Sequence, residues 1–369
     1  MRVLFAGGGT AGHLSPCIAI AQTLRRTDPD VEVAFAISTK PSDAAMLQQR
    51  GLPGHPLSGS GMPYGCSLGA LTSLVRLAAG GCQALGLLRR LRPDVVLATG
   101  GYISAAVVPA ARLLKVPVML LAADVMPDRT NRTLSRWAEL VATVSEGAAD
   151  VFTNTPTIVT GMPVRPEILD VDPAAARQQL AIAPSATVLL VTGGSQGAQR
   201  MNEATVAALP HLLKDPDVFI IHLTGVGKLP APEQLRGLPE NRYLVTERRD
   251  DMGTCLGAAD IVLTRAGANG VAEAAAWGRP MIVVPYPHAG GHQRLNAEIY
   301  EKAGAAVVID DADFTGDLLL STIQHLRANP EQLSEMARAA REQGSATAAE
   351  QIAAELRRLA TARDSARQA

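Results

Sequence analysis

The stretch Val191-Thr-Gly-Gly-Ser-Gln-Gly-Ala-Gln-Arg-Met-Asn202 decides the fold of this chain. It follows an apolar run, Ala186–Val191, and precedes a helical pattern rich in alanine and leucine, which predicts a strand, a glycine turn and a helix start. Glycine lets the backbone approach a bulky anion, Ser195 adds a hydroxyl, and the free N–H groups of a helix start favour negative charge. We interpret this turn as a phosphate site. A tight glycine turn that binds no ligand is the alternative.

Two further glycine loops follow predicted strands in the first half of the chain. Phe5-Ala-Gly-Gly-Gly-Thr-Ala-Gly-His-Leu-Ser-Pro16 lies between a strand over Arg2–Ala6 and a helix over Pro16–Arg26. Ala98-Thr-Gly-Gly-Tyr-Ile-Ser104 follows a strand over Val95–Ala98. The similar units in the two halves predict two mononucleotide-binding-like domains, each with its loop at the carboxyl end of its first strand.

Length and composition agree with two α/β domains. The 369 residues, of which 47% are apolar, suffice for two cores. Short apolar runs alternate with helical patterns, which is typical of parallel sheets buried on both faces. We therefore predict two Rossmann-like parallel-sheet domains that face each other across a ligand-binding cleft. The predicted strands cover residues 2–6, 31–37, 95–98, 118–121, 140–144, 187–192, 218–224, 261–264, 281–285 and 306–309.

Turn residues in the segment Thr160-Gly-Met-Pro-Val-Arg-Pro166 predict a hinge between the domains. We place the N-terminal domain at residues 1–162 and the C-terminal domain at 163–345. A last helix within residues 346–362 carries Ile352, Leu356 and Leu359 on one face. This apolar stripe predicts that the C-terminal helix packs back on the N-terminal domain.

Charge and cysteine usage exclude several classes of protein. The 34 basic and 35 acidic residues give a net charge of −1, so no global field recruits nucleic acid. Four widely spaced cysteines, at 17, 66, 82 and 255, indicate free thiols in a reducing compartment. We expect a cytoplasmic protein, because the first apolar run ends at Gly7 and no window has the roughly 18 apolar residues of a membrane span.

The second half contains another strand, small-residue turn and helix over Leu263–Pro280. Glu273 falls about one turn into that helix, where a carboxylate can accept hydrogen bonds from both hydroxyls of a ribose. Its alternative role is to complement the charge of the helix start. Further on, Gln293 and Asn296 lie at a loop-to-helix start suited to sugar hydroxyls. His288 and His292 lack a third ligand, so we predict no metal site.

Six motifs, in order and at compatible spacing, together resemble the MurG family, the bacterial N-acetylglucosaminyltransferases of glycosyltransferase family 28 that convert lipid I to lipid II. The resemblance covers about residues 1–345. The motifs are Gly7-Gly-Gly-Thr-Ala-Gly-His13, Thr99-Gly-Gly-Tyr102, Gly161-Met-Pro-Val-Arg165, Gly193-Gly-Ser-Gln-Gly-Ala198, Arg265-Ala-Gly-Ala268 with Glu273, and His292-Gln-Arg-Leu-Asn-Ala297.

The resemblance implies a GT-B architecture, with an acceptor- and membrane-binding N-terminal domain and a UDP-GlcNAc-binding C-terminal domain. The implied reaction is inverting transfer of GlcNAc to the 4-hydroxyl of MurNAc in lipid I, for peptidoglycan synthesis. Helix termini would stabilise the departing UDP, so no cofactor or obligatory metal is expected. The implied partners are the UDP-sugar, a lipid-linked acceptor, the inner face of the cytoplasmic membrane, where the protein would be peripheral, and a cell-wall synthesis complex.

The resemblance also implies roles for individual residues. His13 is the candidate base that removes the acceptor proton, because imidazole titrates near neutral pH; orienting the loop is its alternative role. The acceptor would contact Gly9, Thr10, Gly100, Gly101 and Tyr102. The donor would contact Thr10, Ala11, Gly12, Asp124, Arg165, Gly194, Ser195, Gln196, Gly197, Arg249, Ala268, Asn269, Gly270, Val271, Glu273, Gln293 and Asn296.

One departure from the family concerns the acceptor. The chain reads Leu121-Ala-Ala-Asp124 where the family usually has His-Glu-Gln-Asn. Asp124 is therefore a second candidate base, or a residue that orients His13, or the mark of a changed acceptor. In the donor half, Gly270 stands where a hydroxyl-bearing residue is common. Transfer to another lipid or natural-product acceptor, and a non-catalytic UDP-sugar-binding protein of a cell-wall complex, are the alternative functions.

The stretch Met62–Arg92 combines apolar and basic residues and contains no acidic one. An apolar helix face flanked by arginines can rest on an anionic bilayer, which a lipid-linked acceptor requires. Ordinary core helices with arginines in solvent are the alternative. The residues concerned are Leu68, Leu71, Leu74, Val75, Arg76, Leu77, Leu85, Leu87, Leu88, Arg89, Arg90 and Arg92.

Overall fold

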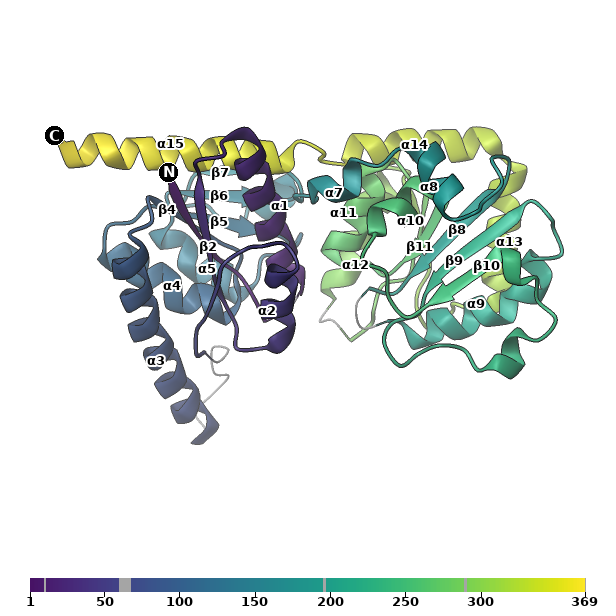
Figure 1. The fold of residues 1–369 in the computed structure, drawn as a ribbon, viewed down its shortest axis with the longest axis horizontal. Coiled ribbons are helices and arrows are strands. Elements are labelled where there is room, and N and C mark those ends of the chain that lie inside the picture. The colour runs from purple at the N-terminus through teal and green to yellow at the C-terminus, as the bar shows by residue number, and fades with distance from the viewer. Residues whose placement is uncertain (10, 60–67, 195–196, 289–290, 369) are drawn as a thin grey trace. The chain divides into compact units, whose positions relative to one another are not determined.

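The computed structural model describes residues 1–9, 11–59, 68–194, 197–288 and 291–368 (Figure 1). The chain forms two compact units. Unit 1 comprises Met1–Arg165 and Thr347–Ala369, and unit 2 comprises Pro166–Ala346. Each unit has one sheet of parallel strands, with helices packed against it. The prediction of two parallel-sheet α/β domains is confirmed.

The sheet of unit 1 has seven strands in the order β3-β2-β1-β4-β5-β6-β7. The chain places β2 on one side of β1 and β4 on the other, so loops diverge at the carboxyl ends of β1 and β4. The strands are β1 (Arg2–Ala6), β2 (Glu32–Ile37), β3 (Gly54–Pro56), β4 (Val95–Ala98), β5 (Val118–Ala122), β6 (Leu140–Thr143) and β7 (Thr157–Val159). The helices are α1 (Ala11–Thr27), α2 (Pro41–Gln48), α3 (Leu68–Leu91), α4 (Gly101–Leu113), α5 (Arg129–Leu134), η1 (Ser135–Trp137), α6 (Glu146–Ala149) and α15 (Ala348–Gln368).

Successive residues of β1 face the two opposite layers of unit 1, as the pleat of a strand requires. Val3 packs in a core cluster with side chains of α1 and α15, whereas Leu4 packs in a cluster with α3 and α4. Ile352 and Leu356 of α15 are fully buried in the first cluster. The prediction that the C-terminal helix packs back on the N-terminal domain is therefore confirmed (Figure 1).

The sheet of unit 2 has six strands in the order β10-β9-β8-β11-β12-β13, which repeats the order of the first six strands of unit 1. Its strands are β8 (Thr187–Thr192), β9 (Val218–Leu223), β10 (Tyr243–Thr246), β11 (Ile261–Thr264), β12 (Met281–Val283) and β13 (Ala306–Val308). Its helices are α7 (Pro166–Leu169), α8 (Pro173–Gln179), α9 (Gln199–Leu212), η2 (Pro232–Leu235), η3 (Glu240–Arg242), α10 (Met252–Ala258), α11 (Ala268–Ala276), α12 (His292–Lys302), α13 (Gly316–Ala328) and α14 (Pro330–Gln343).

Several predicted boundaries were wrong. Helix α1 begins at Ala11 instead of Pro16, and Pro16 lies inside it. Inside a helix, proline cannot donate to the carbonyl four residues earlier, here that of Gly12, and its ring crowds that carbonyl, so proline usually marks a helix start. Helix α15 continues to Gln368, past the predicted end at 362. The Arg363 guanidinium donates to the carbonyl of Pro93, which ties this extension to unit 1. Strands β3, β7 and β10 were not predicted, and each is an edge strand.

A buried polar network joins β9 and β10 to the first turn of α9. Fully buried His222 contacts the Tyr243 hydroxyl with Nδ1 at 2.8 Å and Asn202 Oδ1 with Nε2 at 3.1 Å. The Asn202 amide nitrogen donates to the Thr224 carbonyl at 2.9 Å, so its oxygen accepts a hydrogen bond from the Nε2–H of His222. Nδ1 then accepts from Tyr243, and the imidazole is neutral. Burial lowers the pKa of His222 from 6.5 to about 4.

This lowered pKa predicts acid sensitivity of unit 2. As pH falls, the unfolded chain binds a proton at His222 before the folded chain does, so the folded state loses relative stability between pH 6.5 and about pH 4. We expect this group to lower the free energy of unfolding by up to about 3 kcal/mol. Urea unfolding of the wild type and His222→Gln, at about pH 7 and about pH 4.5, measures the effect. Equal losses in both proteins would contradict it.

Candidate active site

Three helices of unit 2 begin at the carboxyl ends of adjacent strands. Helices α9, α11 and α12 follow β8, β11 and β12, which lie side by side in the sheet. In the described residues, no side chain caps any of these helix starts, and none has an acidic residue in its first turn. Unsatisfied N–H groups and the positive ends of three helix dipoles therefore collect on one face. Such a face is suited to a phosphate-bearing ligand.

The glycine loop between β8 and α9 has the tight turn that the sequence predicted. Gly194 and Gly197 have φ angles of 74° and 65°, and the Gly197 N–H donates to the Gly194 carbonyl at 2.9 Å. A Cβ atom on Gly197 would lie 2.2 Å from the Thr224 carbonyl oxygen, whereas one on Gly194 would meet nothing within 4 Å. Gly197 therefore serves packing, and Gly194 borders open space. Ser195 and Gln196, the predicted phosphate ligands, lie outside the described residues.

An ion-pair bridge that the sequence analysis missed joins these elements. Asp311, just beyond β13, pairs with Arg265 at 2.5 Å and with Arg200 at 3.5 Å. Arg265 follows β11, and Arg200 lies in the first turn of α9. Arg265 also donates to the Val284 carbonyl at 3.1 Å and lies over the Tyr286 ring. One carboxylate thus connects the start of α9 with the loops after β11 and β12.

His13 and Thr99 interlock at the carboxyl ends of β1 and β4 in unit 1. The Thr99 hydroxyl donates to the His13 carbonyl at 3.0 Å, and His13 Nδ1 lies 2.9 Å from the Thr99 carbonyl. A carbonyl only accepts, so Nδ1 carries a proton, and in the neutral form of the ring the lone pair is on Nε2. Nε2 lies 3.6 Å from where a Cβ on Gly101 would be, and Gly101 has a φ of 67°. The glycine leaves room at this nitrogen.

The remaining loop residues of unit 1 gather around the same strand ends. Asp128 caps α5 by accepting from the Asn131 N–H at 2.6 Å, and it also accepts from the Gly101 N–H at 3.4 Å. The Tyr102 ring lies against Gly9, because its Cε1 is 3.1 Å from where a Cβ on Gly9 would be. The loops that follow β1, β4 and β5 are therefore in mutual contact.

Comparison with known proteins agrees with this geometry. Residues 3–143 match the glycosyltransferase family 28 N-terminal domain, and residues 188–352 match its C-terminal domain. The chain belongs to glycosyltransferase family 28. A relative from Desulforudis audaxviator, named UDP-N-acetylglucosamine--N-acetylmuramyl-(pentapeptide) pyrophosphoryl-undecaprenol N-acetylglucosamine transferase, is 37% identical over 98% of this chain and 99% of its own. A Nocardioides relative of the same name is 38% identical over 92% of this chain and 93% of its own.

Structural comparison gives the same family. The crystal structure of Acinetobacter baumannii MurG superposes with a TM-score of 0.74 and 25% sequence identity, covering 97% of this chain and 99% of that one. The resemblance to the MurG family and the GT-B fold class are thus confirmed, as is the assignment to the hexosyltransferases. The sequence motifs had predicted both the family and the fold class. Each motif alone was weakly specific, but six motifs in one order and at compatible spacing were specific together.

The predicted donor residues of this family 28 member lie on α11, α12 and nearby loops. Ala268, Asn269 and Gly270 form the first turn of α11, Val271 is buried beneath it, and Glu273 is half-buried one turn later. Gln293 accepts from the Tyr286 N–H at 2.9 Å. Asn296 is only 4% exposed and donates to the Ala266 carbonyl at 3.1 Å, so it joins α12 to the segment before α11. Their ligand roles stay predictions.

Two arginines were also predicted to contact the donor. Arg249 forms a two-pronged ion pair with Asp251, at 2.8 and 2.5 Å. These hydrogen bonds raise the pKa of Arg249 and lower that of Asp251. The side chain is thus engaged within the chain, which is compatible with the family resemblance, because that resemblance implies a contact between the backbone at Arg249 and the uracil of the donor. Arg165 is the last residue of the first part of unit 1.

The departure from the family lies at the end of β5. Leu121 and Ala122 are fully buried strand residues, and Ala123 is 8% exposed. Half-buried Asp124 is the first polar side chain beyond them. Ala11 and Gly12, predicted to contact the donor sugar, open α1, while Thr10 lies outside the described residues.

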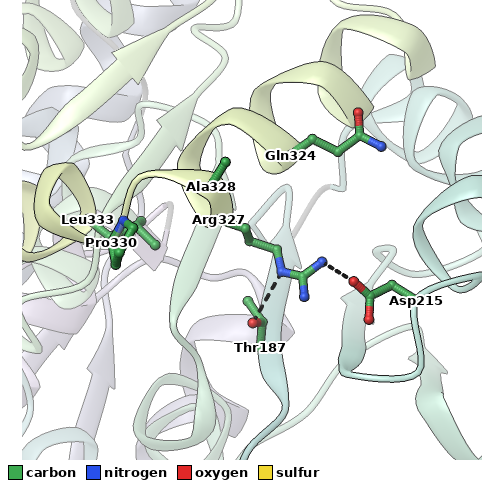
Figure 2. Close-up of a pocket in the computed structure, with 7 residues that line it drawn as sticks. All are labelled: Thr187, Asp215, Gln324, Arg327, Ala328, Pro330 and Leu333. Atoms are coloured by element: carbon green, nitrogen blue, oxygen red, sulfur yellow. Dashed lines mark hydrogen bonds and ion pairs between the residues drawn. The ribbon is translucent and has the colours of Figure 1, made fainter.

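A cavity of about 520 Å³ lies elsewhere in unit 2 (Figure 2). There, Arg327 donates to the Thr187 hydroxyl at 3.3 Å and to Asp215 at 2.6 Å. Thr187 is the first residue of β8, so this cavity is at the amino end of the strand, opposite the helix starts. Because open parallel sheets bind ligands at their carboxyl ends, we assign no substrate to it. Among the described residues, no three His, Cys, Asp or Glu side chains are grouped as a metal site.

The two glycines of the loop give a matched pair of substitutions. Gly194→Ala should lower the free energy of unfolding by about 1–2 kcal/mol, because alanine is strained in the left-handed backbone conformation but its Cβ collides with none of the described residues. Gly197→Ala adds a collision with the Thr224 carbonyl and should cost at least about 3 kcal/mol. Denaturant unfolding of both variants measures the difference. Similar losses of unfolding free energy in the two variants would show that Gly197 does not pack against Thr224.

Proposed function

We propose that this chain transfers N-acetylglucosamine from UDP-GlcNAc to the 4-hydroxyl of MurNAc in lipid I, with inversion, and so makes lipid II for peptidoglycan synthesis. The observation that carries the proposal is the imidazole of His13, whose Nδ1 is committed to the Thr99 carbonyl while Nε2 keeps its lone pair. Such a ring is ready to accept a proton from a hydroxyl. The names of the relatives describe the same donor and acceptor.

The donor half of the proposal uses the helix starts of unit 2. The diphosphate would lie on the loop that contains Gly194, Ser195, Gln196 and Gly197, and on the N–H groups at the start of α11. The ribose hydroxyls would bind Glu273, and the GlcNAc hydroxyls would bind Gln293 and Asn296. As the bond to the anomeric carbon breaks, its electron pair leaves with UDP, and the positive helix ends stabilise that charge. We therefore propose that no metal ion is obligatory.

The acceptor half uses unit 1. His13 Nε2 would take the proton of the acceptor's 4-hydroxyl while the oxygen of that hydroxyl forms the bond to the anomeric carbon. Gly9, Gly100, Gly101 and Tyr102 would contact the acceptor. Asp124 is the rival base, because a carboxylate at the end of β5 can also take a proton or orient His13.

A second candidate function is transfer to a different lipid-linked acceptor. The buried apolar residues Leu121 and Ala122 favour it, since they stand where the family usually presents polar side chains. Turnover of UDP-GlcNAc, measured with a lipid I analogue and in parallel with other lipid-linked sugars as acceptors, distinguishes the two functions. Turnover on lipid I alone supports the first function. Donor binding without turnover on any acceptor would reject both.

Substitutions distinguish the two candidate bases. His13→Ala should lower kcat by roughly 10²–10⁴ while the affinity for UDP, measured by calorimetry, stays nearly unchanged. Asp124→Asn restores the amide that the family usually carries and should retain most of the activity. If Asp124→Asn abolishes turnover and His13→Ala barely matters, Asp124 is the base.

We also propose that the protein works at the inner face of the cytoplasmic membrane, as a lipid-linked acceptor requires. None of the described helices is long and apolar enough to cross a bilayer. In the second half of α3, Leu87 and Leu88 are buried in the core, whereas Arg89, Arg90 and, directly after the helix, Arg92 are exposed. The described part of this helix thus favours charge attraction over apolar insertion. The predicted side chains from Leu68 to Arg76 lie outside the described ones.

Replacing Arg89, Arg90 and Arg92 with glutamate tests this attachment. Each arginine near an anionic surface contributes about 1 kcal/mol, so the variant should sediment less with anionic vesicles. Its turnover should fall with a long-chain acceptor and stay unchanged with a short-chain soluble one. Equal loss on both acceptors, or unchanged vesicle binding, would reject attachment through these arginines.

A further inference from the structure

The first glycine loop already contains an anion, and it belongs to the chain itself. Asp43, in the first turn of α2, is only 4% exposed. Its Oδ2 accepts from the Gly9 N–H at 2.7 Å and from the Ser38 hydroxyl at 2.6 Å. A buried carboxylate thus binds a backbone N–H of the glycine loop, as a phosphate oxygen does in a phosphate-binding loop.

The glycines of this loop are explained by the same carboxylate. A Cβ on Gly8 would lie 2.7 Å from Asp43 Oδ2 and 2.9 Å from the Ser38 nitrogen, so any larger residue would push α2 away. Lys40 donates from Nζ to the Gly9 carbonyl at 2.5 Å. The two polar groups of Gly9 are therefore both satisfied within the chain, its N–H by a carboxylate and its carbonyl by an ammonium group.

The glycine loop of unit 2 differs in this respect. A side chain added at Gly194 would enter open space, whereas one added at Gly8 would meet the Asp43 carboxylate. The two loops have similar sequences and the same place in their sheets. Open space next to Gly194 suits a ligand that arrives from solution, whereas the space at Gly8 is already filled.

We propose that Asp43 is a built-in anion that shapes the first glycine loop and keeps substrate phosphate away from the Gly9 N–H. It is a positioning residue. Gly9 lies against Tyr102 and directly precedes the segment that leads into α1 and His13. Asp43 thereby positions, before any substrate binds, the loop that precedes α1, the helix that carries His13. A pyrophosphate-linked acceptor must then bind its phosphates through groups other than the Gly9 N–H.

Chemical rescue tests the role of the carboxylate. Asp43→Ala should lower turnover at least about 10-fold and change the Kd for UDP, which lacks the donor sugar, less than about 2-fold, because the proposed diphosphate and ribose contacts belong to unit 2. Formate in the tens of millimolar range should restore part of the lost turnover by filling the vacated position. Ser42→Ala, an exposed neighbour in the same helix turn, is the matched control and should behave as wild type. Wild-type turnover in Asp43→Ala would overturn the proposal.

The kinetic test rests on the proposed function, so two further measurements avoid turnover. Formate should raise the Tm of Asp43→Ala and leave the Tm of the wild type and Ser42→Ala unchanged. No shift in folded Asp43→Ala would overturn the proposal.

The second measurement uses only the wild type, in case Asp43→Ala does not fold. When inorganic phosphate is added, the amide resonance of Gly194 should shift and that of Gly9 should not. A Gly9 shift as large as that of Gly194 would overturn the built-in anion. An unmoved Gly194 would count against the proposed donor site and leave the role of Asp43 standing.

Discussion

The parallel direction of every strand places all the candidate functional groups of this protein. Because strands of one sheet point the same way, their following helices begin along one edge, and each start presents unpaired N–H groups. The two units differ in how these N–H groups are treated. In the part of unit 2 that the structure describes, no side chain caps the starts of α9, α11 and α12. Unit 1 fills comparable positions with its own carboxylates, Asp43 at Gly9 and Asp128 at the starts of α4 and α5. One topology therefore supplies a face suited to an anion in one unit and a preformed support for an imidazole in the other.

Central strands could be predicted from the sequence, and most edge strands could not. A strand covered on both faces needs a continuous apolar run, which is visible without knowledge of its neighbours. Edge strands need no such run: β3 is Gly-His-Pro, and three of the four residues of β10 are only half-buried. The glycine turns were predictable for a similar reason, since left-handed backbone demands glycine locally. Contacts across the sheet were not. Asp43 resembles an ordinary acidic residue in a first helix turn, and only the folded sheet brings it to Gly9, 34 positions earlier.

Residue type and spacing identify candidate ligands but do not show the contacts that these residues make within the chain. Asn296 has the residue type and position expected of a sugar ligand, and its side chain is buried and bonds to the backbone before α11. At Leu121 and Ala122 the chain has apolar residues where the family usually has polar ones. Both residues belong to β5 and are fully buried, so apolar packing stands where polar side chains were expected.

The return of α15 to unit 1 has a consequence for synthesis on the ribosome. Unit 2 is continuous in sequence, so its whole core is available once residue 346 has emerged. One core cluster of unit 1 includes Ile352, Leu356 and Leu359, which are made after all of unit 2. Until they arrive, one face of the first sheet exposes apolar side chains, although all of its described strands were translated before unit 2. The usual order, in which the domain that precedes another finishes first, is therefore reversed here, and the nascent chain needs protection of unit 1 for longer than that of unit 2.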